Sequence, residues 1–321
     1  MGRMRKILLL LIVVAALVAG GYVALARNSS GSGSPKTEMS TITTLPSPPS
    51  VCSATVCSTW KNPEPWTGKI PSVMTTVFTP FTSAPTVHAY AAWINTSTTD
   101  IALYLGYKGP GPTTLARGPQ MVPVAGRSHL LAAFNSGFYE ADTAAGFFTH
   151  NTLYFPMVKG AATLIQYKDG SVDIKAWDGG KRPGNDVLVA RQNLSLLIND
   201  SLPTKSTSNN ALWGATLHGV PAVWRTALGL DAQGNLIYVA APSQTSHSLA
   251  LLMSKLHVVR AMQLDINPAW PIFVTYANRG AKGPSLFVPN PNQVSTRFLY
   301  SSTKDFFAVF ASKSAGKPQP W

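Results

Sequence analysis

Three short segments each place one polar residue inside or at the end of an apolar run. Asn135 follows the apolar residues 130–134, Arg225 opens the run 225–230, and Asp265 lies between Leu264 and Ile266. Burying an amide, a guanidinium and a carboxylate separately would cost several kcal/mol each. We therefore expect the three side chains to converge in one cleft, where they satisfy one another or a ligand.

These residue types are ones that can bind a phosphate or act on a sugar. A guanidinium can donate two parallel hydrogen bonds to phosphate oxygens, and a carboxylate near an anomeric carbon can activate water or stabilise positive charge. The amide of Asn135 can donate to a phosphate or sugar oxygen. Structural alternatives stay open, because Asn-Ser-Gly is also a common turn sequence and Arg225 could form a core ion pair with Asp265.

In order and approximate spacing, these segments resemble motifs of the phosphodiester glycosidase family. That family has Asn-Gly-Gly-Phe-Phe, then Arg-Thr-Ala-hydrophobic-Gly, then Leu-Asp-Gly-Gly-Gly-Ser. The corresponding segments here are Asn135-Ser136-Gly137-Phe138-Tyr139, Arg225-Thr226-Ala227-Leu228-Gly229 and Leu264-Asp265-Ile266-Asn267-Pro268. The resemblance covers roughly residues 87–310, and it implies hydrolysis of a sugar-1-phosphodiester bond.

The resemblance also implies residue roles. Asp265 would act as the base or stabilise the transition state, Arg225 would bind phosphate, and Asn135 would position the substrate. Glu140 is a candidate second carboxylate. The candidate substrate-binding residues are Ser136, Gly137, Asn267, Trp270 and His150.

The third segment departs from the family pattern. A glycine-rich loop after the aspartate would offer backbone N–H groups to an anion, whereas Pro268 has no N–H and Ile266 and Trp270 are bulky. Trp270 could instead supply a face on which a sugar stacks. The alternative to an enzyme is a non-catalytic envelope protein of the same fold that binds an anionic glycopolymer.

The histidines do not indicate a metal site. None of the six falls at a metal-ligand spacing, so we expect neither a metal nor another cofactor. His150 follows the apolar residues 146–148 and could line a cleft.

The N-terminus predicts a membrane location. Arg3, Arg5 and Lys6 precede an apolar run over residues 7–26, which at ~1.5 Å per residue would span the ~30 Å of a bilayer core. The positive charge before the run places the N-terminus in the cytoplasm and the remainder outside. A small-x-small pattern ending at Ala26 also fits a cleaved signal, which would give a secreted protein.

Residues 28–86 are rich in Ser, Thr, Pro and Gly, which predicts a linker. Cys52 and Cys57 are the only cysteines, and outside a membrane they are expected to form a small disulfide loop. The net charge of +13 favours an anionic partner. We expect a phosphate-linked cell-surface glycan rather than nucleic acid, and the sequence does not indicate an oligomeric state.

Residues 87–321 predict one α+β domain with a strand-rich mixed sheet and a few helices. Two hairpins are expected, one around Asp169-Gly170 and one between residues 225–230 and 235–240. One apolar face over residues 248–257 predicts a helix, capped by Ser246 or Ser248. A strand over residues 260–266 would place Asp265 near a strand end, where catalytic groups are commonly held.

Overall fold

The structure is a computed structural model that describes residues 46–53, 56–63, 71–112, 114–216, 219–278 and 282–312. The predicted membrane span over residues 7–26 lies outside these residues. None of the helices in the described ranges has the length and apolar character of a membrane span.

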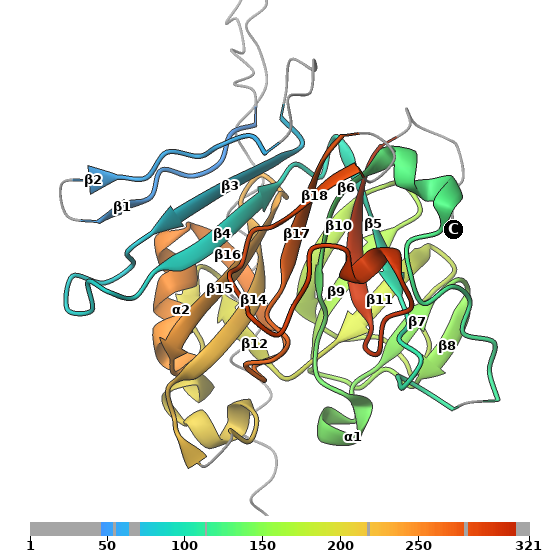
Figure 1. Ribbon diagram of the computed structural model, residues 1–321. Helices are drawn as coiled ribbons and strands as arrows, with labels where there is room; N and C mark the ends of the chain where they lie inside the picture. The colour runs from blue at the N-terminus through green and yellow to red at the C-terminus, as the bar shows by residue number, and fades with distance from the viewer. Residues whose placement is uncertain are drawn as a thin grey trace, which may run out of the picture. The chain divides into compact units, whose positions relative to one another are not determined.

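Three large sheets build the strand-rich α+β domain (Figure 1). The seven-stranded sheet runs in the order β13 (Leu202–Pro203), β12 (Leu196–Asn199), β16 (Val258–Gln263), β14 (Val223–Asp231), β15 (Leu236–Gln244), β4 (Ala89–Ile94) and β3 (Val73–Phe78). One five-stranded sheet has the order β18 (Lys282–Leu286), β17 (Phe273–Asn278), β6 (Leu130–Asn135), β19 (Phe306–Ala311) and β5 (Thr99–Tyr104). The other has the order β10 (Val172–Ala176), β9 (Ala162–Tyr167), β11 (Val187–Gln192), β7 (Phe147–Thr149) and β8 (Thr152–Phe155).

The strand pairings within these described sheets are antiparallel, whereas the sequence predicted a mixed sheet. β14 pairs with β15 and β16 in this way, and β6 with β17 and β19. Short connections such as the turn between β14 and β15 account for the difference, because hairpins join antiparallel neighbours. Both predicted hairpins are confirmed, since β9 also pairs with β10 across Asp169-Gly170.

Alternating side chains divide each sheet between two apolar layers. Leu228 of β14, Met262 of β16 and Phe134 of β6 face a central core shared by the three sheets. The other face of the seven-stranded sheet is covered by α2 (Ser246–Lys255), which contributes Leu249 and Leu252 (Figure 1). The central core therefore fixes the strand ends of different sheets relative to one another.

The predicted helix over residues 248–257 is α2, and it begins slightly earlier than expected. Thr245 is its N-cap, rather than Ser246 or Ser248: the Thr245 hydroxyl accepts from Ser248 N at 3.1 Å. In return, Thr245 N donates to Ser248 Oγ at 3.0 Å. This reciprocal capping box satisfies two N–H groups at once, which a cap at Ser248 would not do.

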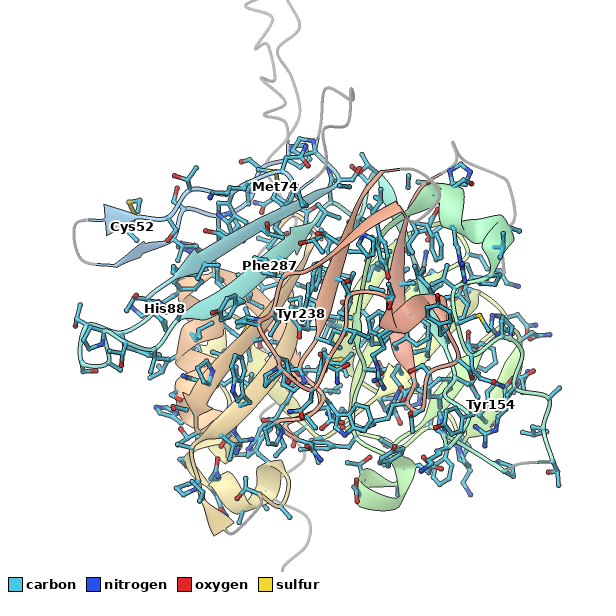
Figure 2. The ribbon with its side chains drawn as sticks, viewed as in Figure 1. Cys52, Met74, His88, Tyr154, Tyr238 and Phe287 are labelled. Carbon is cyan, nitrogen blue, oxygen red and sulfur yellow. A yellow bond between two sulfur atoms is a disulfide. The ribbon has the colours of Figure 1, made fainter. Side chains whose placement is uncertain are left out.

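The folded domain begins before residue 87, which corrects the predicted boundary. β3 pairs along its length with β4, and Val51 and Trp60 pack against the apolar layer beneath α2. The predicted disulfide between Cys52 and Cys57 is confirmed; it joins β1 (Cys52–Ser53) to β2 (Val56–Cys57) (Figure 2). Part of the segment expected to be linker is thus an integral edge of the domain, because its apolar residues find partners there.

Candidate functional site

The site lies where the ends of strands from two sheets meet. Leu264 N donates to Thr226 O at 2.8 Å, which continues the pairing beyond β16, and Asp265 N then donates to Ser136 O at 3.1 Å beyond the end of β6. The backbone at Asp265 therefore bridges the seven-stranded sheet and a five-stranded sheet. Because Phe306 pairs with Asn135, Lys304 approaches the same point from the start of β19.

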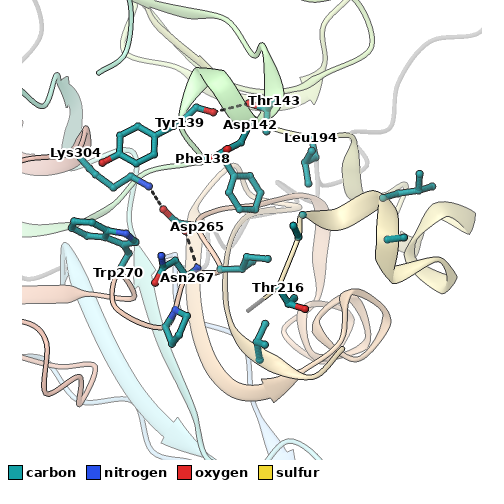
Figure 3. Close-up of a pocket in the computed structure, with 17 residues that line it drawn as sticks. Phe138, Tyr139, Asp142, Thr143, Leu194, Thr216, Asp265, Asn267, Trp270 and Lys304 are labelled. Carbon is teal, nitrogen blue, oxygen red and sulfur yellow. Dashed lines mark hydrogen bonds and ion pairs between the residues drawn. The ribbon is translucent and has the colours of Figure 1, made fainter. Parts of the chain in front are cut away.

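A cavity of about 460 Å³ opens at this junction (Figure 3). Its volume lies in the range of small-molecule sites. The polar and aromatic residues that line it include Tyr139, Asp142, Thr143, Asp265, Asn267, Trp270 and Lys304. The buried side chain of Asp265 therefore borders this cavity.

An ion pair between Asp265 and Lys304 is the main electrostatic feature of the cavity. Lys304 Nζ donates to Asp265 Oδ2, and the two side chains are only 8% and 3% exposed, respectively. The other oxygen, Oδ1, accepts from Asn267 N at 2.9 Å. Burial raises the pKa of the Asp265 carboxyl, and the Lys304 ammonium opposes that rise.

Sequence reasoning missed Lys304. The signal that could have found it is its place two residues before the apolar run 306–310, next to Asp305, because Asp265 and Asn135 were likewise singled out as polar residues at the ends of apolar runs. In an antiparallel sheet the start of one strand lies beside the ends of its neighbours, so a cation at the start of an inner strand lies close to the residues at those ends.

Aromatic rings surround the Lys304 ammonium. Nζ lies 4.1 Å from the ring centroid of Tyr139 and 5.2 Å from that of Trp270, distances at which the ring quadrupole attracts a cation. The guanidinium carbon of Arg297 lies 4.8 Å from the Trp270 ring centroid. Burial raises the pKa of the Tyr139 hydroxyl, and the Asp265 carboxylate adds to that rise. The site therefore places two cations, Lys304 and Arg297, around Trp270 and beside the buried Asp265 carboxylate.

Asn135 is bonded entirely to protein groups. Its Nδ2 donates to Ser136 O at 3.2 Å and to Thr226 Oγ1 at 2.9 Å. Its Oδ1 accepts from Tyr238 OH at 2.8 Å and from Ile272 N at 3.2 Å. These four bonds use both donors and both lone pairs of the amide, so Asn135 clamps the strand ends. The sequence predicted a direct contact with the substrate instead.

Thr226 connects Asn135 to the backbone of Asp265 through hydrogen bonds. Its Oγ1, which accepts from Asn135, donates to Asp265 O at 2.7 Å. Asn135 therefore fixes the backbone of Asp265 through one intervening hydroxyl. The first and second motifs of the sequence thus do meet the third, through Thr226 of the second motif.

Arg225 lies on the opposite face of β14 from Thr226, because consecutive residues of a strand alternate. It is fully buried, and burial lowers the pKa of its guanidinium to about 10, which leaves it charged at neutral pH. Its four hydrogen-bond acceptors are Gln244 O at 2.9 Å, Trp213 O at 3.1 Å, Gln263 Oε1 at 2.7 Å and Asn210 Oδ1 at 2.8 Å. The predicted convergence of Arg225 and Asp265 on one ligand is not seen: Arg225 donates to these protein groups and does not line the cavity, whose wall beside Trp213 it supports from behind.

The remaining predicted site residues divide between the cavity and its surroundings. Asn267 and Trp270 line the cavity. Ser136 and Gly137 lie in a small adjoining space, and a Cβ at Gly137 would come within 3.2 Å of Asn193 Cγ, so this glycine accommodates Asn193.

Glu140 and His150 lie outside the cavity lining. Glu140 opens α1 (Glu140–Thr143) and its Oε1 accepts from Gly111 N at 3.2 Å, while Asp142 of the same helix lines the cavity. His150 occupies the turn between β7 and β8 with φ of 50°. Within the described ranges, no group of three His, Cys, Asp or Glu side chains is arranged to hold a metal ion.

A second buried ion pair supports the cavity floor. Arg191 Nε lies 2.9 Å from Asp305 Oδ2, with both side chains 1% exposed. Arg191 Nη2 donates to Phe138 O at 2.6 Å. This pair connects β11 to the start of β19 and to the segment after β6. It therefore fixes the positions of Lys304 and Tyr139 relative to each other.

Comparison with known proteins finds a family model that is similar to the central part of the chain. Residues 128–265 match the family model of the phosphodiester glycosidases, a stretch that contains Asn135, Arg225 and Asp265. The resemblance predicted from the three motifs is confirmed. No curated protein sequence matches the chain.

Solved structures resemble the chain more distantly. The catalytic domain of zebrafish N-acetylglucosamine-1-phosphodiester alpha-N-acetylglucosaminidase, auto-inhibited by its pro-peptide, is 17% identical, with 81% of this chain and 89% of that chain covered and a TM-score of 0.48. A hypothetical protein from Synechocystis is 11% identical, with 76% and 63% covered and a TM-score of 0.43.

Proposed function

We propose that this chain, whose residues 128–265 carry the phosphodiester glycosidase motifs, is an extracytoplasmic hydrolase. Its substrate would be a sugar-1-phosphodiester of a cell-envelope glycan. The observation that carries the proposal is the buried Asp265–Lys304 pair in the wall of a cavity of about 460 Å³. It supplies a carboxylate for the sugar and a cation for the phosphate within one site.

Asp265 acts at the anomeric carbon. Phosphate is a good leaving group, so the reaction depends less on a general acid than on water activation and stabilisation of an oxocarbenium-like transition state. A carboxylate serves both needs. The raised pKa that burial gives Asp265 makes it a stronger base than an exposed aspartate.

Lys304 takes the role that the sequence assigned to Arg225. Its ammonium lies in the cavity wall beside Asp265, where it can contact a phosphate oxygen and neutralise the charge that develops as the phosphate leaves. Phosphate binding would draw Lys304 toward the ligand and loosen its hold on Oδ2. Asn135 and Thr226 keep the Asp265 backbone fixed during that exchange.

The proposed location follows from the N-terminal sequence. Residues 7–26 would anchor the domain to the cell membrane as a single span, or would be removed after Ala26 to release it. A reporter active only in the cytoplasm, fused after Trp321, is expected to be inactive. An active reporter would contradict this orientation.

One observation favours the second candidate, a protein that binds an anionic glycopolymer without cleaving it. Both oxygens of Asp265 already have protein partners, Asn267 N and Lys304 Nζ. Pro268 also stands where the family has a glycine-rich loop, and it offers no N–H to an anion. Cleavage therefore requires that the ligand displace Lys304 from Asp265.

The test of the proposed function is release of free sugar from a panel of sugar-1-phosphodiesters by the purified chain. The enzyme proposal expects release from at least one member, and a loss of affinity for the intact phosphodiester in Lys304→Met. Lys175→Met is the matched control, because Lys175 pairs with Asp178 at the surface. Binding with no release from any member would favour the glycopolymer-binding candidate.

A further inference from the structure

We infer that the alcohol on the far side of the phosphate, the aglycone, is an aliphatic and apolar one. This inference rests on the proposed function, and it names the substrate class that the cavity would accept. It is carried by the unequal lining of the cavity, which has a charged, aromatic end and an apolar end.

The two ends are visible in Figure 3. Lys304, Trp270, Tyr139 and Asp265 gather at one side of the view, whereas Leu194 lies at the other. Asp142, Thr143 and Thr216 are the polar side chains that border the second side, and the others are apolar. The apolar side chains are Phe138, Leu194, Leu212, Ala215, Val223 and Ile266.

The apolar end begins at a close contact around Gly214. Gly214 has φ of 95°, and a Cβ there would lie 2.9 Å from Phe138 Cζ and 3.0 Å from Ile266 Cδ1. A side chain at this position would collide with both apolar side chains. The absence of a side chain at Gly214 therefore lets Phe138 and Ile266 pack against this segment at the start of the apolar end.

The phosphate fixes which half of the substrate occupies which end. A phosphate on Lys304 places the anomeric carbon beside Asp265, so the sugar stays at the end that offers Tyr139, Asn267 and Trp270. Sugar hydroxyls placed against Leu194, Val223 and Ile266 would lose water without gaining partners, which costs several kcal/mol. The second substituent of the phosphate is therefore the part that enters the apolar end.

The exposure of the apolar end supports an apolar occupant. Leu212 is 56% exposed and Ala215 is also exposed, while Val223 and Leu194 are half-buried. Neighbouring apolar side chains left open to water at a concave site are a feature of ligand-binding grooves. An aliphatic chain would cover them, whereas a second sugar or a glycerol would not.

The inference is tested with three phosphodiesters that share one sugar and differ in the aglycone: octyl, a polyether chain of matched length, and methyl. Affinity is measured by calorimetry on the full chain, and release of free sugar is measured separately. The octyl compound is expected to bind at least ~10-fold more tightly than the polyether, because burial of methylene groups is favourable and burial of ether oxygens is not.

Two variants that replace an apolar side chain by a polar one of similar size test where the aglycone binds. Leu212→Asn and Val223→Thr are each expected to reduce the octyl preference several-fold while leaving affinity for the methyl compound unchanged. Leu202→Asn is the matched control, because Leu202 is 69% exposed and does not line the cavity. Equal affinity for octyl and polyether compounds, or an octyl preference that neither lining variant changes, would overturn the inference.

The outcomes separate this inference from the proposed function. A preference for the octyl compound without sugar release would support the apolar aglycone site and contradict hydrolysis. Sugar release at equal rates from the octyl and polyether compounds would support hydrolysis and contradict the apolar site.

Discussion

Lys304 pairs with Asp265 while its ammonium also lies 4.1 Å from the ring centroid of Tyr139. The carboxylate and its countercharge thus sit together in the wall of one cavity, held by three different strand ends. A pair this buried gains little net stability, because desolvation of both ions offsets their attraction. Because Asp265 and Lys304 also line the cavity, whereas the buried pair Arg191–Asp305 does not, we attribute the Asp265–Lys304 pair to ligand chemistry rather than to folding.

The pH profile of kcat/KM should report the Asp265 carboxyl. The ionised form is the reactive one, and burial raises its pKa, so activity should fall with decreasing pH at values above the ordinary aspartate pKa of about 3.9. In Lys304→Met the ammonium that opposes this rise is gone, and the acid limb should move to still higher pH.

Lys175→Met, at a surface ion pair with Asp178, should leave the acid limb in place. An acid limb that moves to lower pH in Lys304→Met would contradict the assignment of that limb to Asp265.

Asn135→Leu should destabilise the domain strongly. The change keeps the size of the side chain but leaves Tyr238 OH, Ile272 N and Thr226 Oγ1 without this partner in a buried site. At about 1–3 kcal/mol per unsatisfied group, the free energy of unfolding in urea should fall by about 3 kcal/mol or more. Exposed Asn292→Ala should change it by less than about 0.5 kcal/mol; an equally small loss in Asn135→Leu would contradict the clamp.

Arg225→Lys should act mainly on stability. A lysine cannot replace the four hydrogen bonds that the guanidinium makes with its planar fork, so we expect a loss of about 2–4 kcal/mol in the free energy of unfolding. A variant with wild-type stability and lost affinity for a phosphodiester would mean that Arg225 contacts the ligand after all.

Much of the fold could be predicted from local patterns. Asp169-Gly170 specifies its hairpin, and the apolar face of residues 249–256 specifies α2, because turn chemistry and periodicity act over a few residues. The role of β3 could not be predicted in this way. Its place beside β4 depends on an edge that only the assembled sheet provides.

The sequence could predict that polar residues of the site lie at strand ends, but not which residues pair with them. Asp265 is polar in an apolar segment, and that local contrast found it. Which cation pairs with it depends on strand order and on competing partners: β19 lies beside β6, so Lys304 reaches Asp265, whereas Arg225 is held by Gln263 and its other acceptors. Because side chains alternate along a strand, the neighbouring residues Arg225 and Thr226 point to opposite faces of β14.

The most direct test of the account is the rate at which Asp265→Asn releases free sugar from a sugar-1-phosphodiester, compared with the wild-type chain. Asp173→Asn is the control, because Asp173 is also ion-paired, with Arg260, outside the cavity. We predict that Asp265→Asn, shown to be folded by circular dichroism, is slower by ~10²–10⁴, while Asp173→Asn keeps the wild-type rate. A folded Asp265→Asn protein that releases sugar at the wild-type rate would contradict the central claim.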